Sequence, residues 1–99
     1  MRTIKKYVHR IEEELEDAKE YAEDYVEQKV KGNMAMANRY KEMSNDELKH
    51  AGYIHEFAVK EIDEISKVYT PPVEMMEKWE KEHKTFIEKT AWIRQMLAM

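Results

Sequence analysis

A glutamate and a histidine three residues apart are the first candidates for chemistry in this sequence. Glu47 and His50 form a Glu-x-x-His pair within the segment Ser44–Ala51. Residues three positions apart share one face of an α-helix, so this carboxylate and this imidazole would point the same way. The apolar residues around them predict that this face is buried, which costs free energy unless a partner compensates the polar groups. A metal ion would provide that compensation.

The predicted buried face of this helix carries apolar residues at helical spacing. They are Met36, Tyr40, Met43, Ala51, Ile54, Ala58, Ile62 and Ile65. Oxygen and imidazole ligands together suit iron, manganese or zinc better than magnesium or calcium. Zinc has no redox chemistry and usually takes four ligands in a structural site, so it would make this a purely structural centre.

Glu14 is the third residue of the predicted site, and it comes from the preceding helix. It lies among apolar residues spaced by three and four, between Ile11 and Ala18. Glu14 is 18 residues before the turn at Gly32, while Glu47 is 15 and His50 is 18 residues after it. At about 1.5 Å per residue, two antiparallel helices would bring the three side chains to nearly the same height. We therefore expect Glu14, Glu47 and His50 to converge in the core.

Two amphipathic helices would position these side chains. The first is predicted over residues 3–30, where apolar residues recur at steps of three and four. Lys31-Gly32-Asn33 ends it, since glycine suits the left-handed conformation that closes many helices. The second helix is predicted over residues 34–68. Gly52 lies inside it, where glycine costs about 1 kcal/mol relative to alanine, so we expect another backbone to approach closely there.

The second helix has an alternative start at Ser44. The segment Ser44-x-x-Glu47 matches a capping box, in which both side chains bond backbone amides at the beginning of a helix. Glu47 would then cap a helix rather than bind a metal. We favour one continuous helix, because the apolar repeat passes through Met43, Glu47 and Ala51 without a phase shift.

Thr70-Pro71-Pro72 separates the second helix from a third, predicted over residues 73–97. Proline disfavours helix in the residue before it and is tolerated in the first helical turn. The inward stripe of this helix is predicted to be Met76, Trp79, His83, Phe86, Ile87, Thr90, Ile93 and Leu97. Short turns place consecutive helices antiparallel. The fold class is therefore all-α, with one domain over residues 1–99 built as an up-down-up three-helix unit.

The composition excludes several classes of function. Charged residues make up 38% of the chain with a net charge of −4, and no basic patch indicates a nucleic-acid partner. No apolar run approaches the roughly 20 residues that a membrane span needs. The chain has no cysteine, which excludes disulfides and thiolate ligands. With no apolar signal sequence at the start, these features predict a cytoplasmic protein.

The spacing Glu14…Glu47-Leu-Lys-His50 resembles the half-site of the ferritin-like carboxylate proteins. The segments 14–21 and 45–51 look most like rubrerythrin-type helices, and the resemblance covers about residues 10 to 60. It implies two such helix pairs in a four-helix bundle around two iron or manganese ions, held by four glutamates and two histidines. It also implies ferroxidase or peroxide-linked redox activity, which would make the protein an oxidoreductase.

The chain departs from that pattern because it has one clear helix pair and then a single further helix. A second Glu-x-x-His, Glu80-Lys-Glu-His83, lies in the third helix. Counting from the turn at Pro71 places His83 level with Ala58, about 12 Å from the level of His50. A homodimer is the simpler solution, because two copies of Glu14, Glu47 and His50 give the complete ligand set. We therefore expect a homodimer or a higher homo-oligomer.

Other residues have weaker claims to a role. His83 and Asp17 are second-tier metal ligands, and His83 could instead be a buried histidine paired with Glu61 or Glu80. His55 is expected at the boundary of its stripe. The alternative function is a non-enzymatic structural or interaction module, in which Glu47 and His50 form a buried polar pair that fixes the register of the helices.

Overall fold

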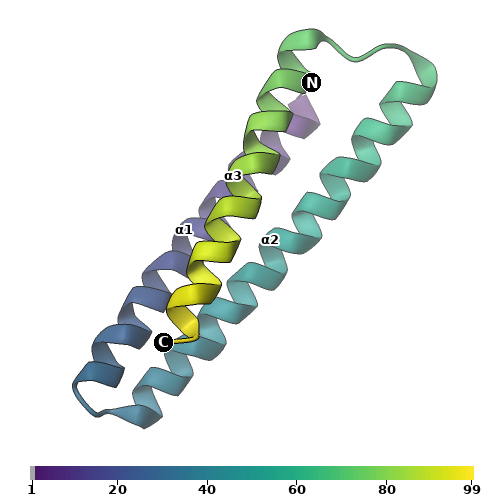
Figure 1. The fold of residues 1–99 in the computed structure, drawn as a ribbon. Coiled ribbons are helices and arrows are strands. Elements are labelled where there is room, and N and C mark those ends of the chain that lie inside the picture. Colours follow the sequence, from purple (N-terminus) through teal and green to yellow (C-terminus); the bar gives the residue numbers. More distant parts are fainter. Residues whose placement is uncertain (1) are drawn as a thin grey trace.

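The chain forms three α-helices in the computed structural model, which describes residues 2–99 and side chains from Thr3 onward. They are α1 (Arg2–Val30), α2 (Met34–Val68) and α3 (Val73–Leu97), and the described residues contain no strand. α1 and α3 run in one direction and α2 in the other, along a body of 55 × 17 × 17 Å (Figure 1). The all-α, up-down-up prediction is confirmed, and only the start of α1 differs, by one residue. None of these helices is long and apolar enough to cross a membrane.

Local backbone chemistry sets the turn between α1 and α2. Gly32 has a φ of +82°, the left-handed conformation predicted for it. Its amide donates to the carbonyl of Lys29, and the amide of Asn33 donates to that of Gln28, which is the hydrogen-bond pattern of a Schellman motif. The side chain of Asn33 then accepts from the amide of Met36 and caps α2. One short segment therefore ends the first helix and starts the second.

α2 is continuous through Ser44, so the capping box is not formed. The Ser44 hydroxyl is buried and donates to the backbone carbonyl of Ala18 in α1, at 2.7 Å. The prediction of one unbroken helix is confirmed. Ser44 therefore connects two helices rather than starting one.

The main packing interface lies between α1 and α2, and α3 packs mostly on α1 with little contact to α2. The buried residues of the first two helices are Ile4, Ile11, Leu15, Ala18, Ala22 and Tyr25 in α1 and Ala37, Ser44, Leu48, Ala51, Ala58 and Ile62 in α2. Their steps of three, four and seven match the 3.5-residue repeat of closely packed antiparallel helices. The many alanines leave room for the two backbones to lie close together.

Parts of the predicted buried faces are wrong. Met36 and Met43 are exposed, whereas Ala37 and Leu48 are buried, so the buried face of α2 is rotated from its predicted position. In α3, Met75 and Glu82 are buried and Ile87 is exposed. The reason is that α3 covers one side of the α1–α2 pair and leaves the other side open.

The close approach expected at Gly52 is absent. A Cβ atom built on Gly52 would meet no other atom within 4 Å. Nothing in the structure explains a glycine at this position.

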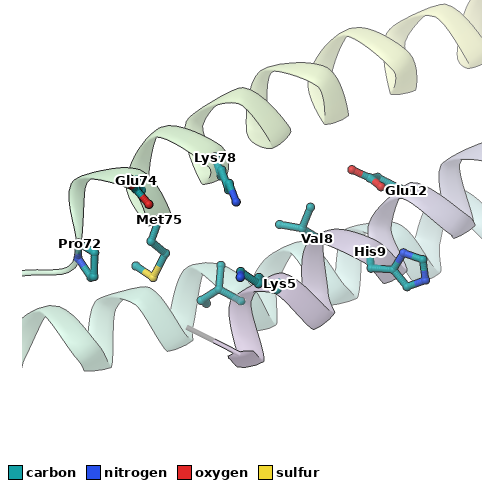
Figure 2. A pocket seen from close by; sticks show the side chains of 9 residues that line it. Lys5, Val8, His9, Glu12, Pro72, Glu74, Met75 and Lys78 are labelled. Atoms are coloured by element: carbon teal, nitrogen blue, oxygen red, sulfur yellow. The ribbon is translucent and has the colours of Figure 1, made fainter.

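An open groove separates the first halves of α1 and α3. Near its end, apolar side chains of Ile4, Val8, Met75 and Pro72 form the floor. Glu12 extends into the groove from α1, and Lys78 extends into it from α3 (Figure 2). The two helices therefore border a space that is open to solvent, with an apolar floor and charged side chains at its sides.

Candidate metal centre

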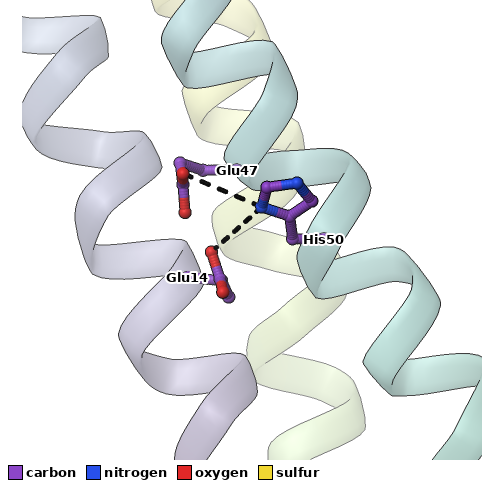
Figure 3. A group of neighbouring side chains, drawn as sticks. All are labelled: Glu14, Glu47 and His50. Carbon is purple, nitrogen blue, oxygen red and sulfur yellow. Dashed lines mark ion pairs between the residues drawn. The ribbon is translucent and has the colours of Figure 1, made fainter.

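Glu14, Glu47 and His50 lie together across the α1–α2 interface (Figure 3). One ligand atom from each lies within 4.8 Å of the others. The Nδ1 atom of His50 is 3.6 Å from a carboxylate oxygen of Glu14 and 3.8 Å from one of Glu47. The convergence expected from counting residues along two antiparallel helices is therefore observed.

The cluster lies at the partly exposed edge of the α1–α2 interface rather than in the core. The side chains of Glu14 and Glu47 are 26% and 21% exposed, and that of His50 is 52% exposed. α3 passes behind the helix pair, on the side away from the cluster (Figure 3). The expectation of a core site is wrong in this respect, because the buried face of α2 centres on Ser44 and Leu48 and leaves Glu47 at its edge.

The two carboxyl groups are close enough to share a proton. Hydrogen bonding to Glu14, partial burial and the negative charge of Glu14 raise the pKa of Glu47 from its ordinary 4.5 to about 7. The nearby imidazole of His50 lowers this pKa, and the carboxylate of Asp17 raises it further. Oε2 of Glu14 is buried and has no hydrogen-bond partner among the described residues. The negative charge of the Glu14 and Glu47 carboxyl groups is therefore only partly compensated by the residues around them.

A divalent cation suits this donor set. It would replace the shared proton, neutralise both carboxylates and accept a lone pair from His50 in its neutral form. Two carboxylates and one imidazole match iron, manganese or zinc. Three protein ligands also leave positions open for water, a substrate or a second set of ligands.

The second-tier residues lie outside this group of three. Asp17 is exposed and acts on Glu47 through its charge. His83 contacts His55 of α2, with Nδ1 of His83 2.7 Å from Nε2 of His55. The expectation that Glu61 or Glu80 would pair with His83 is therefore wrong. His55 is half-buried, as expected for a boundary residue, and its ring stacks on Phe86 with centroids 4.4 Å apart.

Sequence reasoning missed a second pair of carboxyl groups, formed by Glu12 of α1 and Glu82 of α3. Glu82 is buried in the interface between the two helices. The signal was the spacing of Met75, Trp79 and Glu82, which follow steps of four and three along α3. Placing the stripe of α3 one position later, at Met76, hid this relationship.

Comparison with models of protein families, with curated proteins and with solved structures finds no match for this chain. What the cluster can do therefore follows from its own geometry and donor atoms.

Proposed function

We propose that this chain is a ferritin-like metal-binding protein, in which Glu14, Glu47 and His50 bind iron or manganese as half of a two-metal site. The observation that carries the proposal is the convergence of these three ligands within 4.8 Å, on two helices that are antiparallel. The raised pKa of Glu47 adds support, because two carboxyl groups held together without a cation retain a proton.

The open side of the helix pair supports a second copy of the chain as the missing half. Residues at steps of three and four from Glu47 share its side of α2. They are Met36, Tyr40, Met43, His50, Ile54 and Phe57, of which Met36, Met43 and Phe57 are exposed. Tyr21 of α1 stacks on Tyr40 beside them. An apolar face of this kind, with a polar centre, is suited to a self-complementary contact.

The reaction that fits such a dimer is oxidation of ferrous iron. Two copies would supply four glutamates and two histidines, the ligand set of the ferritin-like half-sites combined. Two Fe²⁺ ions held there would each give one electron to O₂, which takes up two protons and leaves as hydrogen peroxide. Peroxide could serve as the oxidant in the same place, since it accepts two electrons and is reduced to water.

Elemental analysis combined with light scattering tests this proposal. Wild-type protein and the variant Glu47→Ala/His50→Ala are loaded with iron or manganese, desalted and measured for metal content and mass. We expect the variant to lose about one ion per chain relative to wild type, and we expect the loaded wild type to be at least a dimer. Glu42→Ala/Glu64→Ala, which removes two exposed carboxylates of α2, is the matched control and retains the metal. Equal metal content in wild type and Glu47→Ala/His50→Ala would overturn the proposal.

A non-enzymatic structural role is the second candidate. The specific observation in its favour is that the imidazole of His50 lies within ion-pair distance of both carboxylates, 3.6 Å from Glu14 and 3.8 Å from Glu47. On this reading the cluster fixes the register of α1 against α2. It predicts that Glu47→Ala/His50→Ala remains folded and that wild type gains no thermal stability from iron or manganese. Zinc, as a structural ion, would raise the thermal stability but would give no O₂ consumption.

A further inference from the structure

The carboxyl group of Glu82 is the most deeply buried acid among the described residues. Glu82 is 6% exposed, and its Oε1 atom is buried without a hydrogen-bond partner in the described part of the chain. The carboxyl group of Glu12 interacts with it across the α1–α3 interface, lines the same groove and is also an acceptor. Two acceptors can be brought together only by a proton or by a cation between them.

The electrostatic state of Glu82 agrees with this geometry. Burial and the carboxyl group of Glu12 raise the pKa of Glu82 from its ordinary 4.5 to about 7. The ammonium of Lys89, which lines the same groove, lowers this pKa. No described lysine or arginine forms an ion pair with Glu82, so its charge is not neutralised by direct contact.

The packing of α3 on α1 holds the two groups together. The ammonium of Lys29 bonds the carbonyl oxygen of Met99, which is 70 positions later, and Glu12 and Glu82 are separated by the same 70 positions. The two helices are therefore parallel and in one register along their length. Trp79, one turn before Glu82, is buried and lies beside His55 of α2, with ring centroids 5.1 Å apart, so this contact opposes a rotation of α3 that would expose Glu82.

The pair is accessible from solvent through the groove between α1 and α3. Glu12 and Glu82 both line this part of the groove, together with Glu16, Thr85, Lys81 and Lys89. Glu12 enters it from the α1 side (Figure 2). An ion could therefore reach Glu82 without the helices separating, and water could complete its coordination.

We propose that Glu12 and Glu82 bind a divalent cation in this groove, as a second site that is separate from Glu14, Glu47 and His50. Two carboxylates completed by water are the ligands that Mg²⁺, Mn²⁺ and Ca²⁺ take in proteins, and Fe²⁺ can use the same oxygens. Glu12 and Glu14 are two residues apart and so lie on nearly opposite sides of α1. One helix therefore serves both sites, and neither site needs the other.

Binding of Mn²⁺ to the Glu47→Ala/His50→Ala variant tests the second site without the first. Titration followed by the EPR signal of free Mn²⁺ gives the stoichiometry and the dissociation constant. We expect about one Mn²⁺ per chain, and at least a tenfold weaker affinity when Glu82→Gln is added. Glutamine keeps the size of the side chain and can donate to Glu12, so the fold should persist, and circular dichroism checks it. Glu88→Gln, an exposed acid of α3, is the matched control and leaves the affinity unchanged.

Two outcomes would overturn the second site. One is a folded Glu47→Ala/His50→Ala protein that binds no Mn²⁺, which would mean that the Glu12–Glu82 pair holds only a proton. The other is unchanged affinity after Glu82→Gln. If Glu82→Gln does not fold, Glu12→Gln at the exposed end of the pair replaces it. The wild-type comparison in the same titration reports separately on Glu14, Glu47 and His50, so the two proposals can fail independently.

Discussion

The hydroxyl of Ser44 donates a 2.7 Å hydrogen bond to the backbone carbonyl of Ala18, and this bond sets the height of α2 against α1. Ser44 is three residues before Glu47, and Ala18 is four residues after Glu14. The bond therefore lies about one helical turn from the cluster on both helices. It positions the carboxyl groups without contacting them.

Ser44→Ala should destabilise the protein by about 1 kcal/mol, since a buried hydrogen bond is lost with little change in volume. Metal affinity at the cluster should fall too, because the helices can then shift against each other. Urea unfolding and metal titration measure the two effects. Ser66→Ala is the matched control, because the Ser66 hydroxyl donates at 2.8 Å to Ile62 in its own helix. Equal effects of the two variants would show that the bond across the interface has no special role.

Metal binding at the cluster should weaken as the pH falls below about 7. The pKa of Glu47 is raised to about 7, so at lower pH a cation must displace a proton to bind. We expect a loss of up to about tenfold in affinity for each pH unit between pH 7 and 6 for each proton displaced. Titrations of wild type with Mn²⁺ at about pH 8, 7 and 6 measure this dependence. A constant affinity over this range would contradict the shared proton.

The titration of Glu82 should make the metal-free protein less stable as the pH rises, whereas metal binding at the cluster becomes stronger as the pH rises. Because the pKa of Glu82 is raised from 4.5 to about 7, the folded state holds this proton more tightly than the unfolded chain. The resulting stability is present below about pH 4.5 and is lost as the pH rises to about 7. Glu82→Gln should therefore stabilise the protein by about 1 to 2 kcal/mol at pH 8 and have little effect near pH 4.5.

Urea unfolding in the presence of a chelator measures that difference. Glu88→Gln, whose side chain is exposed, should change stability by less than about 0.5 kcal/mol at either pH. Destabilisation by Glu82→Gln at pH 8 would contradict this prediction, because it would mean that the folded protein stabilises the ionised carboxylate of Glu82 despite its burial.

The contact between His55 and His83 should weaken in acid. Burial and the charge of His83 lower the pKa of His55 below 6.5, while the carboxylate of Glu56 raises it. The contribution of the neutral pair is complete above about pH 6.5 and is lost as the pH falls through the lowered pKa. Between about pH 7.5 and 5.5, wild type should lose more stability than His55→Phe, whose ring keeps the stack on Phe86. Equal losses in urea unfolding would exclude titration of this pair.

The proposed dimer predicts that a charge on the open side of α2 separates the chains. Phe57 is 54% exposed and lies on the side of α2 that carries Glu47. Phe57→Glu should reduce the mass measured by light scattering to that of one chain and lower the metal affinity. Val59→Glu, at a similarly exposed position on another side of the helix, should leave the mass unchanged. Loss of the dimer in both variants would place the contact elsewhere.

Helix boundaries were predictable because short segments determine them. Gly32 adopts the left-handed conformation that ends α1, and Pro72 stands immediately before α3. The convergence of Glu14, Glu47 and His50 followed from the same information, because a turn of known position and a constant rise per residue fix which side chains are level. Neither inference needed to know what the helices pack against.

The sequence by itself therefore determined three helices, their directions and the cluster that two of them share. Only the tertiary structure decided which side of each helix is buried. With a 3.5-residue repeat, neighbouring faces of a long amphipathic helix are both partly apolar, and the way the three helices pack on one another decides which face is buried. The packing buries Leu48 and leaves Met43 exposed, keeps Glu47 partly exposed at the edge of the α1–α2 interface, and buries Glu82 against α1. Burial depends on what covers a face, and no local signal in the chain reports that.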